Sequence, residues 1–444
     1  MGCGGGNKVL PVSPNARIIE LLDGETQFGV DEIAAYHDGT MVTSVYKVQN
    51  PSEFDQIAAS LKQSMTEVLN ANDWLMSRCR HIPDESRPNG RLALVIEEKT
   101  SNTANYIHES VSDSVKSKNF DDVKKVLLEQ RISYLNALWD QDEGVLTKFG
   151  IISSADKSTC VIFFTLNHLL GDGATLYQLW KMLDQTVPVT TLQATRNMAF
   201  DTEKYCETKT SVLPDGCKPE EFTNIYMANW MGPMMKKAVS QLFKRKPMNQ
   251  YLVTLNPEEI NKRKAQYSVP SSNVFVSTND VILSWMQDLL PKINHIFMPV
   301  NFRNRIEGIT TDMAGNYHQL PMLYNKDMQT PLTVRTWLNN VMNPGYKWKF
   351  PTEQEFRKYL GGVNTSWTGF YHHIEPQGLS HVCHFPVYPA QSAGGGQELD
   401  FIVFKSGKDA SGMEEVSVNI LNRRPEITMA SLLADPMVKN NLSL

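Results

Sequence analysis

The sequence predicts an α/β protein organised in two domains. The chain has 444 residues, which is more than a single hydrophobic core usually holds. Segments with the periodicity of helices and of strands alternate in both halves of the chain. A stretch of different composition, residues 200–248, separates the two halves.

The composition is that of a globular protein and excludes several classes of function. Hydrophobic residues make up 41% of the chain and charged residues 20%, which is enough apolar material for two cores. The formal net charge is −5, so we expect no basic surface for nucleic acid. The six cysteines include no CxxC pair, which favours reduced thiols and a cytoplasmic location. No apolar run approaches the ~20 residues that cross a bilayer, so we expect neither a transmembrane nor a secreted protein.

The elements of the first half follow from the spacing of apolar residues. Helical spacing between Phe54 and Leu69 predicts a helix, with Ser52 as its N-cap. We expect a strand at Leu92–Glu97 and a second amphipathic helix over residues 120–139.

The segment Cys160–Leu166 is short, rich in β-branched and aromatic residues, and apolar on both faces. These features are typical of a strand in the middle of a buried sheet. After a turn at Gly171–Gly173, apolar residues recur on one helical face at Leu176, Leu179, Trp180 and Leu183. The first half therefore ends with a strand, a turn and a helix.

The second half repeats the alternation of strands and helices. Its predicted strands are Tyr251–Leu255, Val274–Ser277, Ile296–Val300 and Leu399–Phe404. Its predicted helices are Pro257–Gln266 and a segment with Val281, Ile282, Trp285 and Leu289 on one face.

The separating stretch is expected to be a crossover between domains. Its part 225–246 combines methionines and aromatic residues with a run of basic residues. That composition suits a helix packed at the domain interface, or one lying on a membrane surface. We expect residues 15–200 to form the first domain, residues 201–248 the crossover, and residues 249–444 the second domain.

Residues 1–14 are expected to be a flexible N-terminus. Gly2 and Cys3 stand where a myristoyl and a palmitoyl chain attach in dually lipidated proteins, although Gly6 replaces the usual Ser or Thr. The alternative is a frayed glycine-rich end without lipid. With lipid, the protein would associate with membranes through its N-terminus.

The sharpest chemical signal is the segment Asn167–Gly173. His168 follows the buried strand, and Asp172 lies between two glycines in a tight turn. A histidine is an effective general base near neutral pH, and a hydroxyl that attacks a thioester needs such a base. A structural turn is the alternative interpretation of the same residues.

This segment resembles the HxxxDG signature of the chloramphenicol-acetyltransferase-like superfamily of acyltransferases. Its members include BAHD acyltransferases, condensation domains of peptide synthetases, and wax ester synthase/diacylglycerol acyltransferases. The resemblance implies two chloramphenicol-acetyltransferase-like domains, each a mixed sheet with helices, and an active-site tunnel between them. It also implies that His168, Asp172 and Gly173 form the catalytic motif.

Three further segments resemble motifs of the same enzymes. Val276–Ile282 is similar to the Asn-Asp motif of wax ester synthases, which implies a supporting role for Asn279 and Asp280. Helix capping explains these residues as well, with Thr278 or Asn279 as the N-cap and Asp280 in the first turn complementing the helix dipole.

Met298–Arg303, followed by a Gly-Asn pair ending at Asn316, resembles the Pro-Val-Asn-x-Arg…Gly-Asn pattern. The resemblance implies a buried, bidentate pair between Arg303 and Asp172, and places Asn301 and Asn316 near the substrate. Arg305 is the competing partner.

Asn364–Trp367 is similar to a Thr/Ser-Ser-Trp element near the tunnel of several members. The resemblance implies that Ser366 donates a hydrogen bond to the tetrahedral oxyanion beside Trp367. The alternative is a loop serine next to a core tryptophan. The spacing of His381, Cys383 and His384 fits no standard metal site, so we expect no metal.

The predicted activity is an O-acyltransferase that moves an acyl group from acyl-CoA to a small hydrophobic alcohol or lipid. The resemblance implies acyl-CoA as co-substrate, no bound cofactor and a monomeric protein. One alternative is a condensation-type enzyme fed by a carrier-protein thioester. Another is a non-catalytic binding module that retains the tunnel.

Overall fold

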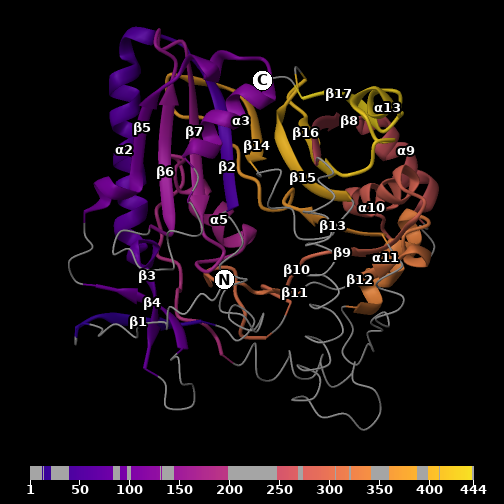
Figure 1. Cartoon of the computed structure of the whole chain (residues 1–444), viewed down its shortest axis with the longest axis horizontal. Helices are drawn as coiled ribbons and strands as arrows, with labels where there is room; N and C mark the ends of the chain where they lie inside the picture. The colour runs from indigo at the N-terminus through magenta and orange to yellow at the C-terminus, as the bar shows by residue number, and fades with distance from the viewer. Residues whose placement is uncertain are drawn as a thin grey trace, which may run out of the picture.

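The computed structural model contains two mixed β-sheets that lie side by side, with helices packed against them (Figure 1). It describes residues 13, 15–21, 40–83, 91–97, 102–130, 132, 145–198, 248–268, 274–305, 307–319, 322–341, 360–387, 399–409 and 411–442. The predicted α/β class is therefore confirmed. The predicted crossover and N-terminus lie outside the described residues, so the domain boundaries stay predictions.

The first sheet has five strands. In spatial order they are β14 (Leu379–Val387), β2 (Thr40–Val48), β7 (Thr159–Leu166), β6 (Thr147–Ser153) and β5 (Ile107–Val111). β7 is central and buried on both faces, as its apolar sequence predicts. Its end therefore lies deep inside the molecule, where the candidate motif begins.

Helices cover both faces of this sheet. α2 (Phe54–Ala71) and α5 (Gly173–Lys181) share one core with inward-facing residues of β2, β6 and β7. α3 (Phe120–Glu129) packs on the other face, in a core that also includes Phe404 and Leu252 of the second sheet. The predicted helix over 120–139 thus ends at Glu129 within the described residues.

The second sheet has seven strands. In spatial order they are β12 (Met322–Tyr324), β9 (Ile293–Phe297), β13 (Leu360–Ser366), β15 (Leu399–Lys408), β16 (Glu414–Asn422), β8 (Asn249–Leu255) and β17 (Val438–Asn441). One face is covered by α9 (Pro257–Tyr267), α10 (Thr278–Leu289) and α11 (Pro331–Val341). The other face turns toward the first sheet, because Ile402 and Leu421 join the core of the first sheet.

β14 links the two sheets through the backbone. The chain leaves the second sheet after β13, pairs antiparallel with β2 of the first sheet, and returns as β15. The first sheet is therefore completed by a strand from the C-terminal half of the sequence, which the sequence analysis does not anticipate.

Two local predictions are wrong. Val274–Ser277 is not a strand, because only residue 274 forms an isolated bridge and Ser277 instead caps α10. Ser52 does not cap α2, because it lies inside the 3-10 turn η2 (Pro51–Glu53), whose N-cap is Asn50. The N-cap residue of α2 is Glu53, which makes no capping hydrogen bond with its side chain.

Two smaller sheets complete the described part. β1 (Arg17–Glu20), β4 (Arg91–Ile96) and β3 (Arg78–Ile82) form an antiparallel sheet beneath the first domain (Figure 1). β10 (Val300–Asn301) and β11 (His318–Gln319) form a short antiparallel pair between the two halves of the molecule. Within the described residues, no helix combines the length and the apolar character needed to cross a bilayer.

Candidate active site

His168 lies in a turn directly after β7, and Asn167 shapes that turn. The buried Asn167 accepts the Leu169 N–H on its side-chain oxygen at 2.9 Å, and its carbonyl accepts the Leu170 N–H at 2.9 Å. Gly171 is required because a Cβ atom there would lie 2.7 Å from the side chain of Thr175. The turn therefore presents His168, which is half-buried, at the end of the central strand.

Asp172 begins α5 and serves as its N-cap. Its Oδ1 atom accepts the Thr175 N–H at 3.0 Å and the Thr175 hydroxyl at 3.2 Å. The next residue, Gly173, packs against Trp367, whose Nε1 would be 3.0 Å from an added Cβ. The carboxylate thus holds the turn and the helix together.

Arg303 supplies the charge partner of Asp172, as the resemblance implies. Its Nη1 donates to Asp172 Oδ2 at 2.7 Å, and both side chains are almost fully buried. The predicted bidentate geometry is wrong, because Oδ1 is occupied by the cap of α5. The second fork nitrogen, Nη2, donates instead to the Thr175 hydroxyl at 3.0 Å and to the Gly315 carbonyl at 2.8 Å. Arg305 does not take this place.

The pair of Arg303 and Asp172 keeps the Asp172 carboxyl group ionised. Burial alone would raise the pKa of Asp172, but the positive charge of Arg303 and the neighbouring His318 hold that pKa well below its usual range. Asp172 is therefore ionised at neutral pH.

The loop with Gly315 and Asn316, from the second half of the chain, forms hydrogen bonds with the His168 turn. Gly315 accepts the Asp172 N–H on its carbonyl at 3.2 Å, and Asn316 donates from Nδ2 to the His168 carbonyl at 2.7 Å. Asn301 accepts two bonds from Arg303, one from the backbone N–H at 3.1 Å and one from Nη1 at 3.2 Å. Asn301, Arg303 and Asn316 are therefore all joined by hydrogen bonds to the His168 turn or to its partner Arg303. That Asn301 and Asn316 lie near the substrate stays a prediction.

Arg196 is a positioning residue that the sequence analysis missed. It is 5% exposed and donates to four backbone carbonyls, those of Leu169, Leu170, Ala194 and Ala314. These carbonyls belong to the motif turn, to the segment before Arg196 and to the loop of the second half. No sequence signal marks Arg196, since it lies in an irregular segment with no periodicity.

His318 is the second residue that the sequence analysis missed. Strand β11 places its ring 5.8 Å from the ring of His168, centroid to centroid, in an edge-on arrangement. Its Nδ1 lies 3.6 Å from Asp172 Oδ2. The only available signal was its position two residues after Asn316.

The remaining predicted residues lie at the start of α10 and at the end of β13. Asn279 accepts a hydrogen bond from Asn364 Nδ2 at 3.0 Å, and Asp280 forms a capping box with Ser277 and a 2.7 Å ion pair with Arg335. These contacts hold the start of α10 against β13 and α11.

Trp367 is buried in the core of the first sheet, with its ring 5.9 Å from that of Tyr177. Ser366 shares a hydrogen bond with Thr368 at 3.1 Å. Trp367 therefore reaches the start of α5, whereas the described contacts of Ser366 are local.

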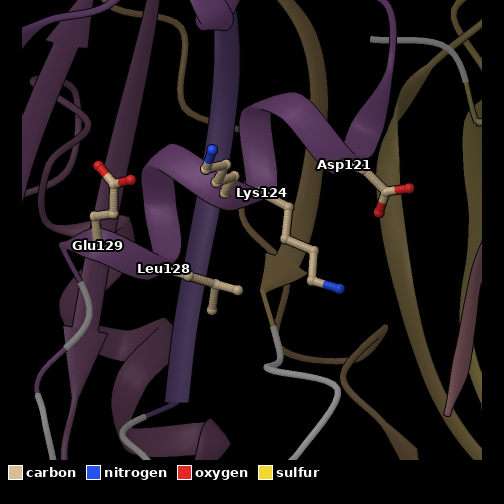
Figure 2. A pocket seen from close by; sticks show the side chains of 5 residues that line it. Asp121, Lys124, Leu128 and Glu129 are labelled. Atoms are coloured by element: carbon tan, nitrogen blue, oxygen red, sulfur yellow. The ribbon is translucent and has the colours of Figure 1, made fainter. Parts of the chain in front are cut away.

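Two cavities stand out in the described part of the molecule, and His168 lines neither. One, of about 430 Å³, lies along α3, and Figure 2 shows Asp121, Lys124, Leu128 and Glu129 around it. The other, of about 400 Å³, lies between α2 and the segment 182–189. The predicted tunnel through the His168 site remains a prediction.

The architecture matches that of solved acyltransferases and condensation domains. TRI101 of F. graminearum, complexed with coenzyme A and T-2 mycotoxin, superposes with a TM-score of 0.56 at 12% identity, over 94% of this chain and 97% of that chain. Vinorine synthase superposes with a TM-score of 0.55 at 14% identity, over 98% of this chain and 96% of that chain.

The first condensation domain of the CDA synthetase gives a TM-score of 0.55 at 10% identity, over 93% of this chain and 92% of that chain. No protein-family profile and no curated protein sequence matches the chain. The protein therefore has the two-domain chloramphenicol-acetyltransferase-like fold that the sequence motifs indicate.

Proposed function

We propose that the protein is an acyltransferase that moves an acyl group from acyl-CoA to the hydroxyl of a hydrophobic alcohol or lipid. The observation that carries the proposal is the hydrogen bond from Asn316 to the His168 carbonyl, which fixes a histidine turn of one half against a loop of the other. A general base at the junction of two domains can meet two substrates that enter from different sides.

His168 acts as the general base in this mechanism. It removes the proton of the acceptor hydroxyl as the oxygen attacks the thioester carbonyl, and a tetrahedral intermediate forms. The intermediate expels the thiolate of CoA, which takes the proton back from the imidazolium of His168. No covalent acyl-enzyme is needed, and the base contributes about 10²–10⁴-fold in rate.

The other motif residues support this step without contacting the reacting atoms. Asp172 and Arg303 hold the turn and the first turn of α5, which keeps His168 in place. For the oxyanion we propose a hydrogen bond from Ser366, next to Trp367, which packs on the start of α5.

Coenzyme A is the proposed donor because TRI101, a protein of the same fold, is complexed with it. Peripheral association with membranes through lipidated Gly2 and Cys3 is part of the proposal and rests on the sequence.

A condensation activity with a carrier-protein thioester is the second candidate. It is favoured by the match to the condensation domain, whose TM-score is close to that of TRI101. A donor comparison separates the two, because a condensation enzyme would use an acylated carrier protein and leave acyl-CoA unchanged.

The test of the proposal is release of free thiol from acetyl-CoA and palmitoyl-CoA in the presence of 1-hexadecanol, cholesterol, 1,2-dioleoylglycerol or octylamine. We expect thiol release and an acylated product with at least one hydroxyl acceptor. We expect His168→Ala to lower kcat by about 10²–10⁴-fold with an unchanged Tm.

His372→Ala is the matched control. His372 pairs with Asp184 at 2.8 Å, so this substitution removes a histidine that lies outside the His168 turn. Wild-type activity is expected for it. A His168→Ala protein with more than about a tenth of wild-type turnover would contradict the base assignment.

A further inference from the structure

A second histidine, His318, lies next to the His168 ring at the motif turn. Strand β11 sets His318 opposite Asn301 of β10, and Asn301 in turn binds Arg303. The rings of His318 and His168 are 5.8 Å apart and inclined by 60°. Two imidazoles from opposite halves of the molecule thus face one another at the proposed site of chemistry.

The two nitrogens of His318 have different surroundings. Nδ1 is fully buried and lies 3.6 Å from Asp172 Oδ2, which is slightly longer than a hydrogen bond. Because Arg303 keeps that carboxylate ionised, the neutral imidazole is most stable with its proton on Nδ1. Nε2 then carries the lone pair and acts as a hydrogen-bond acceptor.

Nε2 is the accessible nitrogen of the ring. The side chain of His318 is 21% exposed although Nδ1 is buried, and no described residue forms a hydrogen bond with Nε2. An acceptor nitrogen is therefore accessible on a ring whose centroid lies 5.8 Å from that of His168.

We propose that His318 binds the acceptor substrate by accepting a hydrogen bond at Nε2, an inference that rests on the acyltransferase function proposed above. The reacting hydroxyl has a single hydrogen, and His168 removes it. The hydrogen bond to His318 must therefore come from a second donor on the acceptor. This selects acceptors with a second hydroxyl beside the reacting one, such as a 1,2-diol lipid, over simple alcohols.

The test compares 1,2-hexadecanediol with 1-hexadecanol as acceptors, at saturating palmitoyl-CoA. The wild-type protein is expected to favour the diol in kcat/KM by about tenfold, which is the contribution of one hydrogen bond. His318→Asn places its amide near Nδ1 and leaves nothing at Nε2. It should lose the preference for the diol, so that the ratio of the two kcat/KM values falls toward one.

His318→Gln distinguishes acceptor binding from a structural role. Its longer side chain places an amide oxygen near the position of Nε2, so it should retain part of the diol preference. A purely structural role through Asp172 predicts the reverse order, with Asn better than Gln and both acceptors affected equally. His372→Asn, at the His–Asp pair outside the site, is the control and should leave the preference unchanged.

Each outcome of these measurements either supports or contradicts the proposed role of His318. A diol preference that disappears in His318→Asn and persists in part in His318→Gln supports the proposal. A wild-type protein that acylates both alcohols equally, or a preference that survives in His318→Asn, overturns it while leaving the acyltransferase function intact. A wild-type protein that releases no thiol with any acceptor overturns the acyltransferase function itself, and the role of His318 with it.

Discussion

At the scale of single residues, the motif turn is held by groups that differ in kind. Asn167 forms hydrogen bonds with the backbone of its own turn, and Asp172 caps α5. Arg196 donates hydrogen bonds to backbone carbonyls of three segments. These bonds are buried, where a lost partner costs more than in water. The position of His168 is therefore set by several side chains that bind the backbone of its turn and of the neighbouring segments.

The first prediction concerns Arg303. Replacement by lysine should lower the free energy of unfolding by about 3–5 kcal/mol, because it leaves the buried carboxylate of Asp172 poorly paired. Lysine has one ammonium group and cannot reach Asp172, Thr175 and the Gly315 carbonyl from one planar fork. Urea unfolding of both proteins at pH 7 measures the difference.

The exposed pair of Lys157 and Asp55 is the control for this experiment. Its atoms are also close, at 2.8 Å, but the side chains of Lys157 and Asp55 are 40% and 77% exposed. Lys157→Met should therefore cost less than about 1 kcal/mol. Equal losses for the two substitutions would contradict the claim that burial makes the Arg303 pair essential.

At the scale of elements, the sequence predicts those helices and strands whose buried residues recur at a regular spacing along the chain. β7 is apolar on both faces because it is central, and α2 carries its buried residues at helical spacing. The start of α5 follows from Asp172 and two glycines. The resemblance also indicates the contact of Arg303 with Asp172, which the structure contains, since that pattern spans the two halves.

Other elements are held by contacts between distant parts of the chain, which local sequence periodicity does not predict. β14 pairs with β2 about 330 residues earlier in the chain, and histidines and Pro386 interrupt its apolar sequence. Arg196 lies in irregular chain, and His318 lies in a strand of two residues. Their roles follow only from the approach of the two halves, so sequence periodicity could not identify them.

The second prediction concerns the start of α10, where a strand was expected. Ser277 accepts the Asp280 N–H, and the Asp280 carboxylate accepts the Ser277 N–H at 2.7 Å. Ser277→Ala should lower the free energy of unfolding by about 1 kcal/mol, since it removes one side of the capping box. Thermal and urea unfolding measure the loss.

Ser52→Ala is the matched control for the cap. Ser52 lies inside η2 and does not cap α2, so its loss should change stability by less than about 0.5 kcal/mol. A larger effect for Ser52→Ala than for Ser277→Ala would restore Ser52 as the cap of α2.

At the scale of the whole molecule, polar groups are buried where the two halves meet. Lys124 of α3 donates to Gln250 of β8, and Gln250 donates to Asn419 of β16 at 2.9 Å. His384 of β14 binds Ser44 and Tyr177 through its two ring nitrogens, at 2.9 and 2.8 Å. Such bonds fix the relative placement of the halves, which apolar contacts alone specify less sharply.

The third prediction concerns Asp400 on the interface side of β15. Its neighbours Leu399 and Phe401 pack on the helices of the second half, while Ile402 packs in the core of the first sheet. Since strand side chains alternate, Asp400 faces the first sheet. Burial raises the pKa of Asp400 to about 7, although a 2.9 Å hydrogen bond from the Val363 N–H and the charge of Arg423 oppose the shift.

A raised carboxyl pKa makes folding favour the protonated form. Between pH ~4 and pH ~7 the folded protein binds a proton at Asp400 that the unfolded chain has released. The contribution of Asp400 to stability is therefore fully present below pH ~4 and falls by about 1.4 kcal/mol per pH unit up to pH ~7. Asp400→Asn keeps a side-chain oxygen for the Val363 N–H and carries no charge at any pH, so it should be increasingly more stable than wild type as pH rises through this range.

Urea unfolding of the wild type and Asp400→Asn at intervals from pH 5 to pH 8 tests this prediction. Buried histidines work in the opposite direction, because burial lowers the pKa of His381 to about 3 and holds that of His384 well below its ordinary value. Both therefore reduce stability as pH falls below about 6.5. They are present in both proteins, so the difference between the two stability curves isolates Asp400. A constant difference across the range would mean that the carboxyl is already ionised in the folded interface, with a charge partner strong enough to offset its burial.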